Sequence, residues 1–203
     1  MSRSTLVNQP FLYISLPVIL GIICSHIFWN EDEIFHFLNS YHSSFGDFLF
    51  PVITEIGNGY VMGLICLLLI AIEKKDFKQR FSTVFISWLI GALIILIAKN
   101  LLWPESPRPL AALGREALQV VEGVPIYSWQ SFPSGHTATA FSLLFALSIP
   151  YAKSWQITAA LIAILVGYSR IYLNQHFSID VAVGATIGLF SGLMAQEIVS
   201  RRL

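Results

Sequence analysis

Long apolar runs separated by short polar segments dominate this chain of 203 residues. A helix that crosses a membrane needs about 20 mostly apolar residues. Six runs approach that length, near residues 11–29, 57–72, 81–101, 135–151, 155–170 and 179–198. The pattern predicts an all-α, polytopic membrane protein with six transmembrane helices, in which residues 1–203 form a single membrane-embedded domain.

The segment between the first two runs, residues 30–56, mixes acidic and aromatic side chains. Such a mixture predicts an amphipathic helix lying in the membrane interface, and a re-entrant segment is the alternative. Glu55 and Asn58 crowd the start of the second run, which is the weakest of the six. The first run follows a segment containing Arg3, and no small-x-small cleavage site comes after it. We therefore expect a signal anchor rather than a cleaved signal peptide.

Composition supports the membrane assignment. Hydrophobic residues make up 55% of the chain and charged residues 12%, with a mean hydropathy of +0.68, whereas an ordinary soluble domain is roughly 25% charged. The formal net charge is zero, so no basic character points to a nucleic-acid partner. Cys24 and Cys66 lie inside apolar runs, where thiols usually pack as small apolar groups. The sequence has no Cys/His cluster with zinc spacing, and we expect no metal site.

The distribution of Lys and Arg predicts the orientation, because cytoplasmic loops carry an excess of both. With the amino terminus inside, the inner segments hold eight of the twelve: Arg3, Lys74, Lys75, Lys78, Arg80, Lys153, Arg201 and Arg202. The outer segments hold the other four: Lys99, Arg108, Arg115 and Arg170. The short loops contain no Asn-x-Ser/Thr sequon. These features predict a multi-pass protein of a bacterial inner membrane, with its outer face in the periplasm or outside the cell.

Two further stretches have a predicted structural role. The outer loop of residues 102–132 contains Pro104, Pro107, Pro109 and Pro125, which stop helix formation, and it is a natural lid or substrate-recognition surface. In the last run, glycines recur at four-residue spacing, which lets a neighbouring helix approach closely; they are Gly184, Gly188 and Gly192. We expect this stripe to serve packing and not chemistry.

The sequence Pro133-Ser134-Gly135-His136 opens the fourth run. Proline is tolerated in a first helical turn, and the unpaired N–H groups there form an anion site at the positive end of the helix dipole. Ser134 adds a hydroxyl donor, and Gly135 lets the backbone approach a ligand closely. The alternative is an ordinary helix start with an interfacial histidine.

Arg170, His176 and Asp180 lie at the junction of the last two runs, where Ser178 is the expected cap of the final helix. A carboxylate near the Nδ1–H of a histidine fixes its tautomer and frees Nε2 to react. Taken singly, Asp180 could simply favour the helix dipole and Arg170 could snorkel at a helix end. Their combination with a second histidine on the same predicted face favours a functional site.

Two more cations share that face. Lys99 lies at the end of the third run, and Arg108 stands between two prolines, which is an unusual setting for a free surface charge. Ionisable residues near hydrocarbon are costly and indicate function by default. The remaining histidines are interpreted as interfacial residues without a catalytic role: His26, His36 and His42.

These residues resemble the type 2 phosphatidic acid phosphatase superfamily, which includes bacterial lipid phosphatases, glucose-6-phosphatases and vanadium haloperoxidases. Its second motif, Pro-Ser-Gly-His, matches residues 133–136 in full. Its third motif, Ser-Arg, five residues, His, three residues, Asp, matches residues 169–180 in full. The first motif departs, since the family usually has six residues between Lys and Arg-Pro, whereas eight separate Lys99 from Arg108.

The resemblance implies a metal-independent lipid phosphate phosphatase without a cofactor. His176, oriented by Asp180, would form a phosphohistidine, and His136 would act as general acid and then general base. The phosphoryl oxygens would be held by Lys99, Arg108, Ser134, Gly135 and Arg170. The substrate would be a lipid phosphate of the outer leaflet, among membrane lipids: undecaprenyl pyrophosphate, phosphatidylglycerol phosphate, phosphatidic acid or lipid A.

Three alternatives remain open at this point. A lipid phosphotransferase would pass the phosphoryl group of the same phosphohistidine to another lipid. A non-catalytic carrier would bind a phospholipid without cleaving it, but an anion site alone needs no pair of histidines with a carboxylate. A haloperoxidase would need bound vanadate and would gain nothing from a membrane.

Overall fold

The computed structural model of the chain describes residues 9–73 and 76–202, and these residues form helices and one isolated β-bridge between Pro107 and Trp129. The longer helices are α1 (Gln9–Ser25), α4 (Gly59–Glu73), α5 (Phe77–Ile97), α7 (Gly135–Ser148), α8 (Lys153–Tyr172) and α9 (Ser178–Arg202). The shorter ones are α2 (Glu31–Asn39), α3 (Ser44–Glu55), a π-helical turn (Ala98–Leu102), α6 (Pro109–Leu113) and a 3₁₀ turn (Arg115–Ala117).

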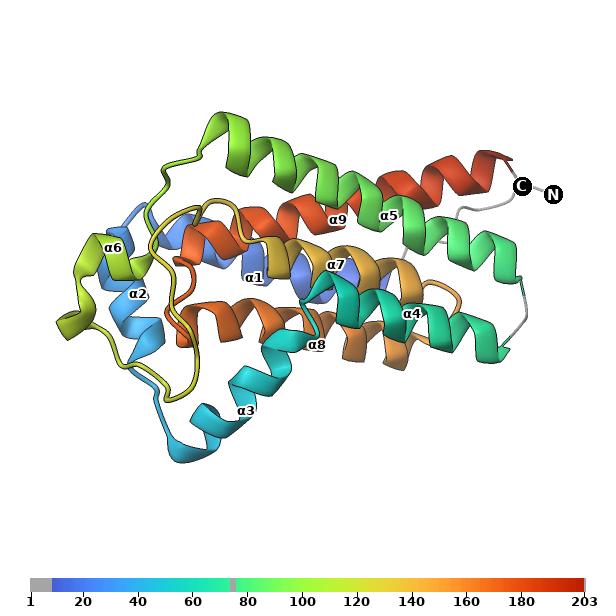
Figure 1. The fold of residues 1–203 in the computed structure, drawn as a ribbon. Coiled ribbons are helices and arrows are strands. Elements are labelled where there is room, and N and C mark those ends of the chain that lie inside the picture. The colour runs from blue at the N-terminus through green and yellow to red at the C-terminus, as the bar shows by residue number, and fades with distance from the viewer. Residues whose placement is uncertain (1–8, 74–75, 203) are drawn as a thin grey trace.

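The six longer helices run side by side as one bundle, with α7 at its centre (Figure 1). Helix α7 contacts α4, α5, α8 and α9, and eleven of its fourteen residues are buried. A helix that is apolar on all sides is stable only when neighbours surround it. The core continues through Phe11 of α1, whose ring packs edge-on against Phe145 of α7 with centroids 5.4 Å apart.

The helix positions agree closely with the six apolar runs of the sequence. At the first run the prediction extended to Trp29, whereas α1 ends at Ser25. The Ser25 hydroxyl and the Nδ1–H of His26 both donate to the carbonyl oxygen of Ile22. These side-chain bonds compete with the next helical turn for the same acceptor, and residues 26–28 form turns instead.

The stretch that sequence predicted as a single interfacial helix contains two, α2 and α3. Asn30 caps α2 through a capping box with Glu33. Helix α3 then meets α4 at a bend of 68°. The bend coincides with Glu55 and Asn58, whose side chains are joined by a hydrogen bond of 3.2 Å.

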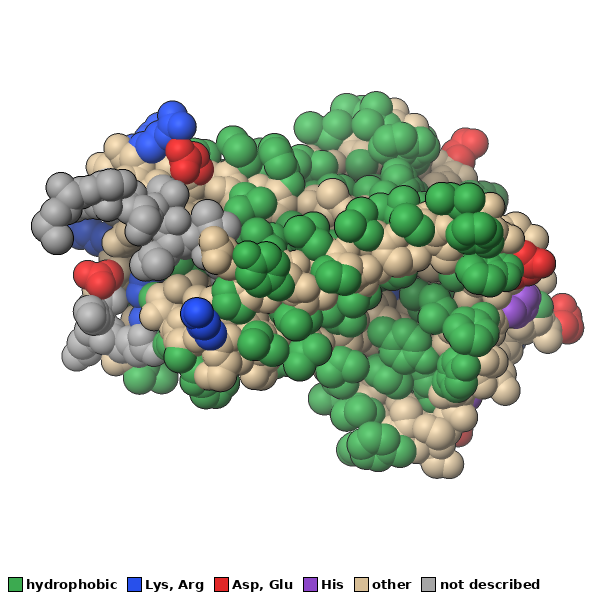
Figure 2. Space-filling model, turned by 180° about the vertical axis from the view of Figure 1, so that it is seen from behind, with side chains coloured by type: hydrophobic (Ala, Val, Ile, Leu, Met, Phe, Trp, Pro, Cys, Tyr) green, Lys and Arg blue, Asp and Glu red, His purple; other side chains and the backbone are tan. Residues whose placement is uncertain are grey.

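Three described helices are long and apolar enough to cross a membrane: Phe77–Leu102, Lys153–Tyr172 and Ser178–Arg202. The bent pair α3 and α4 passes the same test when taken together, while α1, at 17 residues, is shorter. Large apolar side chains are exposed along these helices. Figure 2 shows such side chains covering the middle of one face, with charged side chains toward the two ends.

The two ends of the bundle differ in their charged residues. The starts of α5 and α8 and the end of α9 lie at one end, and α2, α6 and the long loop before α7 lie at the other (Figure 1). Lys78 and Arg80 belong to the start of α5, and Lys153 belongs to the start of α8. Arg3, Lys74 and Lys75 lie outside the described residues. Lys78, Arg80 and Lys153 therefore lie at the opposite end of the bundle from the predicted site, as the alternation of the six runs between inner and outer segments requires.

The glycine stripe of α9 packs against α7, as predicted. A Cβ atom at Gly188 would stand 2.5 Å from the Cβ of Phe141 and 2.6 Å from the carbonyl oxygen of Ala138. At Gly192 the same atom would meet the Phe145 ring at 2.5 Å. Real Cβ atoms do not approach so closely, so only glycine permits this contact between the two helices.

Gly188→Ala should therefore destabilise the protein by about 1–3 kcal/mol, because the added methyl group overpacks the interface between α7 and α9. The measurement is the melting temperature of the detergent-solubilised protein. The matched control is Gly21→Ala in α1, where an added Cβ meets nothing within 4 Å. The control should melt at or above the wild-type temperature. Equal melting temperatures for the two variants would contradict the packing role of the stripe.

Candidate active site

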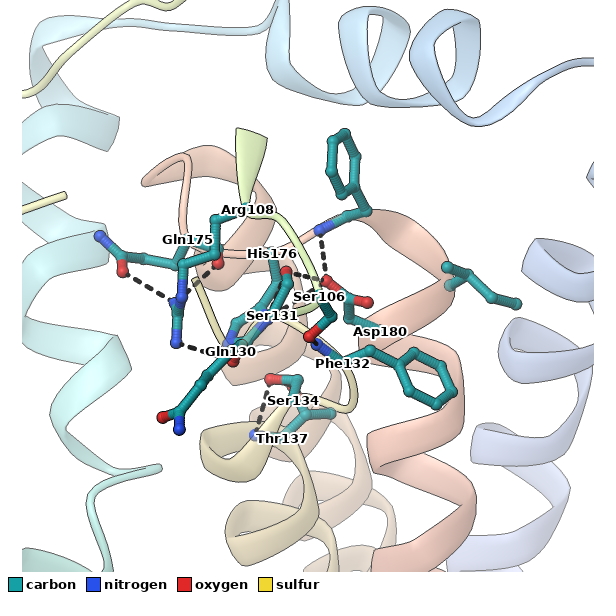
Figure 3. A network of polar contacts seen from close by, with 12 residues as sticks. Ser106, Arg108, Gln130, Ser131, Phe132, Ser134, Thr137, Gln175, His176 and Asp180 are labelled. Carbon is teal, nitrogen blue, oxygen red and sulfur yellow. Dashed lines mark hydrogen bonds and ion pairs between the residues drawn. The ribbon is translucent and has the colours of Figure 1, made fainter. Parts of the chain in front are cut away.

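The predicted site residues come from several separate parts of the chain and meet at the end of the bundle opposite the starts of α5 and α8 (Figure 1). Figure 3 shows Arg108, His176 and Asp180 of this site. Lys99 comes from the π-helical turn that ends α5, and Arg108 from the loop after it. His136 is the second residue of α7. Arg170 is near the end of α8, His176 lies between α8 and α9, and Asp180 is in the first turn of α9.

His176 and Asp180 form a buried pair. The Nδ1 atom of His176 lies 3.3 Å from Oδ2 of Asp180, and the two residues are 2% and 3% exposed. The same oxygen accepts the backbone N–H of Phe177 at 2.9 Å and the Ser131 hydroxyl at 2.5 Å. Because a carboxylate only accepts, the proton of a neutral His176 ring resides on Nδ1. Its Nε2 atom therefore carries the lone pair.

Burial and positive charge keep His176 neutral. Burial lowers the pKa of its imidazole well below the usual value, and the charges of Arg108, Arg170 and Lys99 lower it further. A neutral ring is the nucleophilic form. The positive charges of these cations thus lower the pKa of His176 in the ligand-free protein.

The start of α7 differs in detail from the prediction. The helix begins at Gly135 with Ser134 as its N-cap, so Pro133 precedes the first turn, joined to Phe132 by a cis peptide bond. The Ser134 hydroxyl lies 2.8 Å from that of Thr137 and accepts the Thr137 N–H at 3.4 Å. Its backbone N–H donates to the carbonyl oxygen of Asp180 at 3.0 Å. The expected phosphate donor is therefore engaged in capping.

Arg108 is tied to the surrounding backbone through most of its guanidinium. Its Nε donates to the carbonyl oxygen of Trp129 at 2.8 Å, and Nη2 donates to that of Gln130 at 3.3 Å. Nη1 donates to the carbonyl and side-chain oxygens of Gln175 at 2.8 and 3.2 Å. The side chain of Gln175 donates in turn to the carbonyl oxygen of Pro125. Arg108 thus connects the long loop to the residue before His176.

Lys99 reaches the same carbonyl group as Arg108. Its Nζ donates to the Gln130 oxygen at 2.5 Å. The π-helical turn that contains Lys99 closes with a hydrogen bond from the Trp103 N–H to the Ala98 oxygen at 2.8 Å. A π turn accommodates one residue more than an α turn, so it takes up part of the extra length of the first motif. Lys99 and Arg108 are consequently brought together despite their longer separation in sequence.

Arg170 is buried and only partly satisfied. Its Nη1 donates to the Thr54 hydroxyl at 2.5 Å, whereas its Nε has no partner in the described structure. Arg170 is 7% exposed, and a buried donor without an acceptor is costly. Arg170 thus keeps an unpartnered N–H donor inside the bundle.

His136 lines a pocket of about 400 Å³ together with Lys99, Gln130 and Asn58. Gly135 borders the same pocket. At the break between α3 and α4, a Cβ on Gly57 would lie 2.8 Å from the Cβ of His136. The absence of a side chain there lets the break pack directly against the start of α7.

The first turn of α9 is capped from another helix. The carboxylate of Glu31 in α2 accepts the backbone N–H and the hydroxyl of Ser178 at 2.9 and 2.8 Å, and the N–H of Ile179 at 3.3 Å. It also lies 2.7 Å from Nε2 of His26. Ser178, expected to cap α9 itself, is instead a donor to this carboxylate.

Sequence reasoning missed four residues that hold the site: Glu31, Thr54, Ser131 and Gln175. Ser131 and Gln175 stand beside motifs, but adjacency alone does not predict a contact. Glu31 and Thr54 act across more than a hundred residues, and no local pattern encodes such a pairing. The loop of residues 102–132, expected to lack helix, also contains α6, which Pro109 opens at a position where proline is tolerated.

Among the residues that the structure describes, no group of three or more His, Cys, Asp and Glu side chains is arranged to hold a metal ion. The polar groups of the site are instead two imidazoles, one carboxylate and three cationic side chains. Such a set can bind an anion, orient a nucleophile and transfer a proton.

Fold and site together define an all-helical membrane protein with a histidine- and cation-lined site at one end. The model of the PAP2 superfamily matches residues 102–203, half of the sequence, and the chain belongs to that superfamily.

The structure is similar to two solved ones. The crystal structure of Aquifex aeolicus LpxE matches with a TM-score of 0.70 and 28% identity, covering 81% of this chain and 93% of that one. The PAP2-type phosphatidylglycerolphosphate phosphatase of Bacillus subtilis matches with a TM-score of 0.66 and 21% identity, covering 93% and 97%. The second likeness concerns the fold alone.

Two named relatives match by sequence. The undecaprenyl-diphosphatase BcrC of Bacillus subtilis is 28% identical over 158 residues, or 76% of each chain. The lipid A 1-phosphatase of Porphyromonas gingivalis is 43% identical over 65 residues, which are 30% of this chain and 15% of that protein. The names of these relatives share a phosphate-bearing lipid as substrate.

Proposed function

We propose that this protein is a membrane lipid phosphate phosphatase that hydrolyses a phosphomonoester or pyrophosphate of a lipid. The observation that carries the proposal is the convergence of the His176–Asp180 pair, His136 and three cations at the end of an apolar bundle. Membership of the PAP2 superfamily and the names of the relatives support it. A carrier would need the cations alone.

In the proposed reaction His176 is the nucleophile. The contact with Asp180 places the proton on Nδ1, so Nε2 attacks phosphorus while the bond from phosphorus to the lipid oxygen breaks. The product of this step is a phosphohistidine, and Asp180 stabilises the positive charge that develops on the ring.

His136 is the proposed general acid and base. It gives a proton to the departing lipid oxygen and then removes one from a water molecule. The water oxygen attacks phosphorus, the bond from phosphorus to Nε2 of His176 breaks, and inorganic phosphate leaves. The position of His136 at the pocket wall, beside Lys99, supports this role.

The three cations hold the phosphoryl oxygens and balance their charge in the transition state, so the reaction requires no metal or other cofactor. The unpartnered Nε of buried Arg170 supports direct contact with phosphate. Lys99 and Arg108 converge on one carbonyl oxygen. Gly135 contributes its N–H at the start of α7, where the helix dipole favours an anion, and Ser134 holds that turn in place.

The lipid chain has a suitable path. The pocket beside His136 shares Gly59, Tyr60 and Trp88 with an apolar groove of about 500 Å³ between α4 and α5. Apolar side chains line the groove, including Leu64, Leu67 and Phe85. A phosphate at the polar end would leave its acyl or prenyl chain along the groove, in contact with the bilayer. This arrangement favours a lipid over a soluble phosphoester.

The six longer helices are the proposed transmembrane segments, with α2 and α3 near the outer interface. The basic residues at the opposite end then face the cytoplasm, and the site takes its substrate from the outer leaflet of a bacterial inner membrane. Substrates of this kind include undecaprenyl pyrophosphate, phosphatidylglycerol phosphate, phosphatidic acid and the phosphates of lipid A.

The experiment that tests the function is release of inorganic phosphate by the purified protein from a panel of these lipids, with EDTA present. His176→Ala should lower turnover by about 1,000-fold or more, because no neighbouring group replaces the nucleophile. His36→Ala, on the exposed face of α2, is the matched control and should keep wild-type activity. A His176 variant with more than about a tenth of wild-type turnover would exclude the phosphohistidine. Transfer of labelled phosphate from the substrate to an added lipid alcohol would identify a phosphotransferase.

A second prediction concerns the departure in the first motif. Lys99→Ala should cost about as much as Arg108→Ala, roughly 2–4 kcal/mol of transition-state stabilisation or about 30- to 1,000-fold in kcat/KM. The reason is that both side chains reach the same carbonyl oxygen at the pocket. Arg115→Ala, in an exposed turn, serves as control. Wild-type kcat/KM for the Lys99 variant would remove that residue from the site.

The proposed orientation has its own test. In a background with Cys24 and Cys66 changed to Ala, a cysteine at exposed Glu122 should react with a membrane-impermeant thiol reagent added to intact cells. A cysteine at exposed Lys78, at the start of α5 and thus at the opposite end of the bundle, should react only after the membrane is opened. The reverse labelling pattern would place the site on the cytoplasmic side.

A further inference from the structure

Two consecutive residues before α7, Gln130 and Ser131, face different parts of the site (Figure 3). Gln130 has a φ of +59°, in the left-handed region that residues other than Gly, Asn and Asp seldom adopt. Its side chain is exposed, so side-chain packing does not account for this conformation. The contacts of its carbonyl group account for the conformation. The Gln130 oxygen accepts a hydrogen bond from Nζ of Lys99 at 2.5 Å and another from Nη2 of Arg108 at 3.3 Å.

Ser131 faces the nucleophile pair. It is 1% exposed, and its hydroxyl donates to Oδ2 of Asp180 at 2.5 Å while lying 3.4 Å from Nδ1 of His176. Its backbone N–H is bound to the carbonyl oxygen of Ser106 at 3.1 Å. The hydroxyl is thus a third donor to the carboxylate oxygen that orients His176.

The left-handed conformation of Gln130 explains how two consecutive residues can contact the cations and the His176–Asp180 pair. With Gln130 in this conformation, its carbonyl oxygen turns to the cations while the next side chain points to the buried pair. An extended or right-handed conformation at Gln130 would rotate that peptide group away from Lys99 and Arg108. One short stretch of chain therefore contacts Lys99, Arg108, His176 and Asp180. It continues through Phe132 and Pro133 into the helix that carries His136.

We propose that Gln130 and Ser131 are the positioning residues of this site. The Gln130 carbonyl sets Lys99 and Arg108 for the phosphoryl group, and the Ser131 hydroxyl fixes Asp180, which in turn holds the Nδ1–H of His176. Neither residue has to touch the substrate. The inference rests on the proposed phosphatase function. It identifies the residues that position the cations Lys99 and Arg108 and the His176–Asp180 pair.

The test at Gln130 compares two variants that both remove the side-chain amide. Gln130→Gly keeps the left-handed conformation available, whereas Gln130→Val opposes it because a β-branched residue rarely adopts positive φ. The glycine variant should stay within about 3-fold of wild-type kcat/KM, and the valine variant should lose about 30-fold or more, mainly through a higher KM. Equal activities of the two variants, both high or both low, would overturn the positioning role of the carbonyl group.

The test at Ser131 uses Ser131→Ala and Ser131→Thr. The alanine variant should lower kcat by about 10-fold with KM unchanged, and threonine should restore most of it because the hydroxyl returns. Rapid-quench measurements should show slower formation of the phosphohistidine in the alanine variant. Because partial unfolding would also lower the apparent kcat without changing KM, kcat is calculated per active site, counted from the amplitude of phosphohistidine formation. The melting temperature of the alanine variant should stay at the wild-type value. Wild-type kcat for Ser131→Ala would refute the proposal at this residue.

A binding measurement separates this inference from the proposed function. Calorimetric titration with inorganic phosphate reports the cation arrangement without any hydrolysis. Gln130→Val should bind phosphate about 10-fold more weakly than Gln130→Gly, even if no lipid in the panel is cleaved. Absence of hydrolysis with this difference present would refute the phosphatase function alone, and equal phosphate affinities would refute the positioning role alone.

Discussion

The close approach of α9 to α7 is the contact on which the site depends. A Cβ atom at Gly184 would lie 2.5 Å from the carbonyl oxygen of Ser134, so the first turns of the two helices are in backbone contact. That contact allows the Ser134 N–H to donate to the Asp180 carbonyl at 3.0 Å. It also fixes the distance between the motif of His136 and the motif of His176. Any larger residue in the stripe would separate them, whatever the side chains of the site.

The second constraint is electrostatic. Three cations lie around two imidazoles in a partly buried region, where repulsion between like charges is stronger than in water. Backbone carbonyls of Trp129, Gln130 and Gln175 offset part of it for Arg108, and burial with the cations keeps the pKa of His176 low. An incoming phosphate would supply the missing negative charge. This electrostatic balance supports the proposal that the ligand of the site is an anion.

The sequence predicts the parts of this protein that local pattern controls. Six apolar runs locate the six longer helices to within a few residues, and the motifs of His136 and His176 identify the elements that meet. The contacts that sequence reasoning missed join distant elements, such as Glu31 to the first turn of α9 and Thr54 to Arg170. Neither residue shows a local signal, because its partner is determined only when the bundle packs. The π turn at Lys99 is an intermediate case. The longer first motif indicates that the backbone departs from the usual geometry, but only the structure shows that the departure is a π-helical turn.

The three cations also differ in how many N–H groups they retain for a ligand. A guanidinium has five N–H donors and an ammonium three. Among the described residues, Arg108 spends four donors on backbone and side-chain oxygens, Lys99 one and Arg170 one. In the proposed reaction Arg108 therefore acts mainly through its charge and through the loop that it fixes. Under the same proposal, direct contact with phosphoryl oxygens falls chiefly to Lys99 and Arg170. These two residues stand at the ends of two different helices, so they would hold a phosphate between them only while α5 and α8 keep their places around α7.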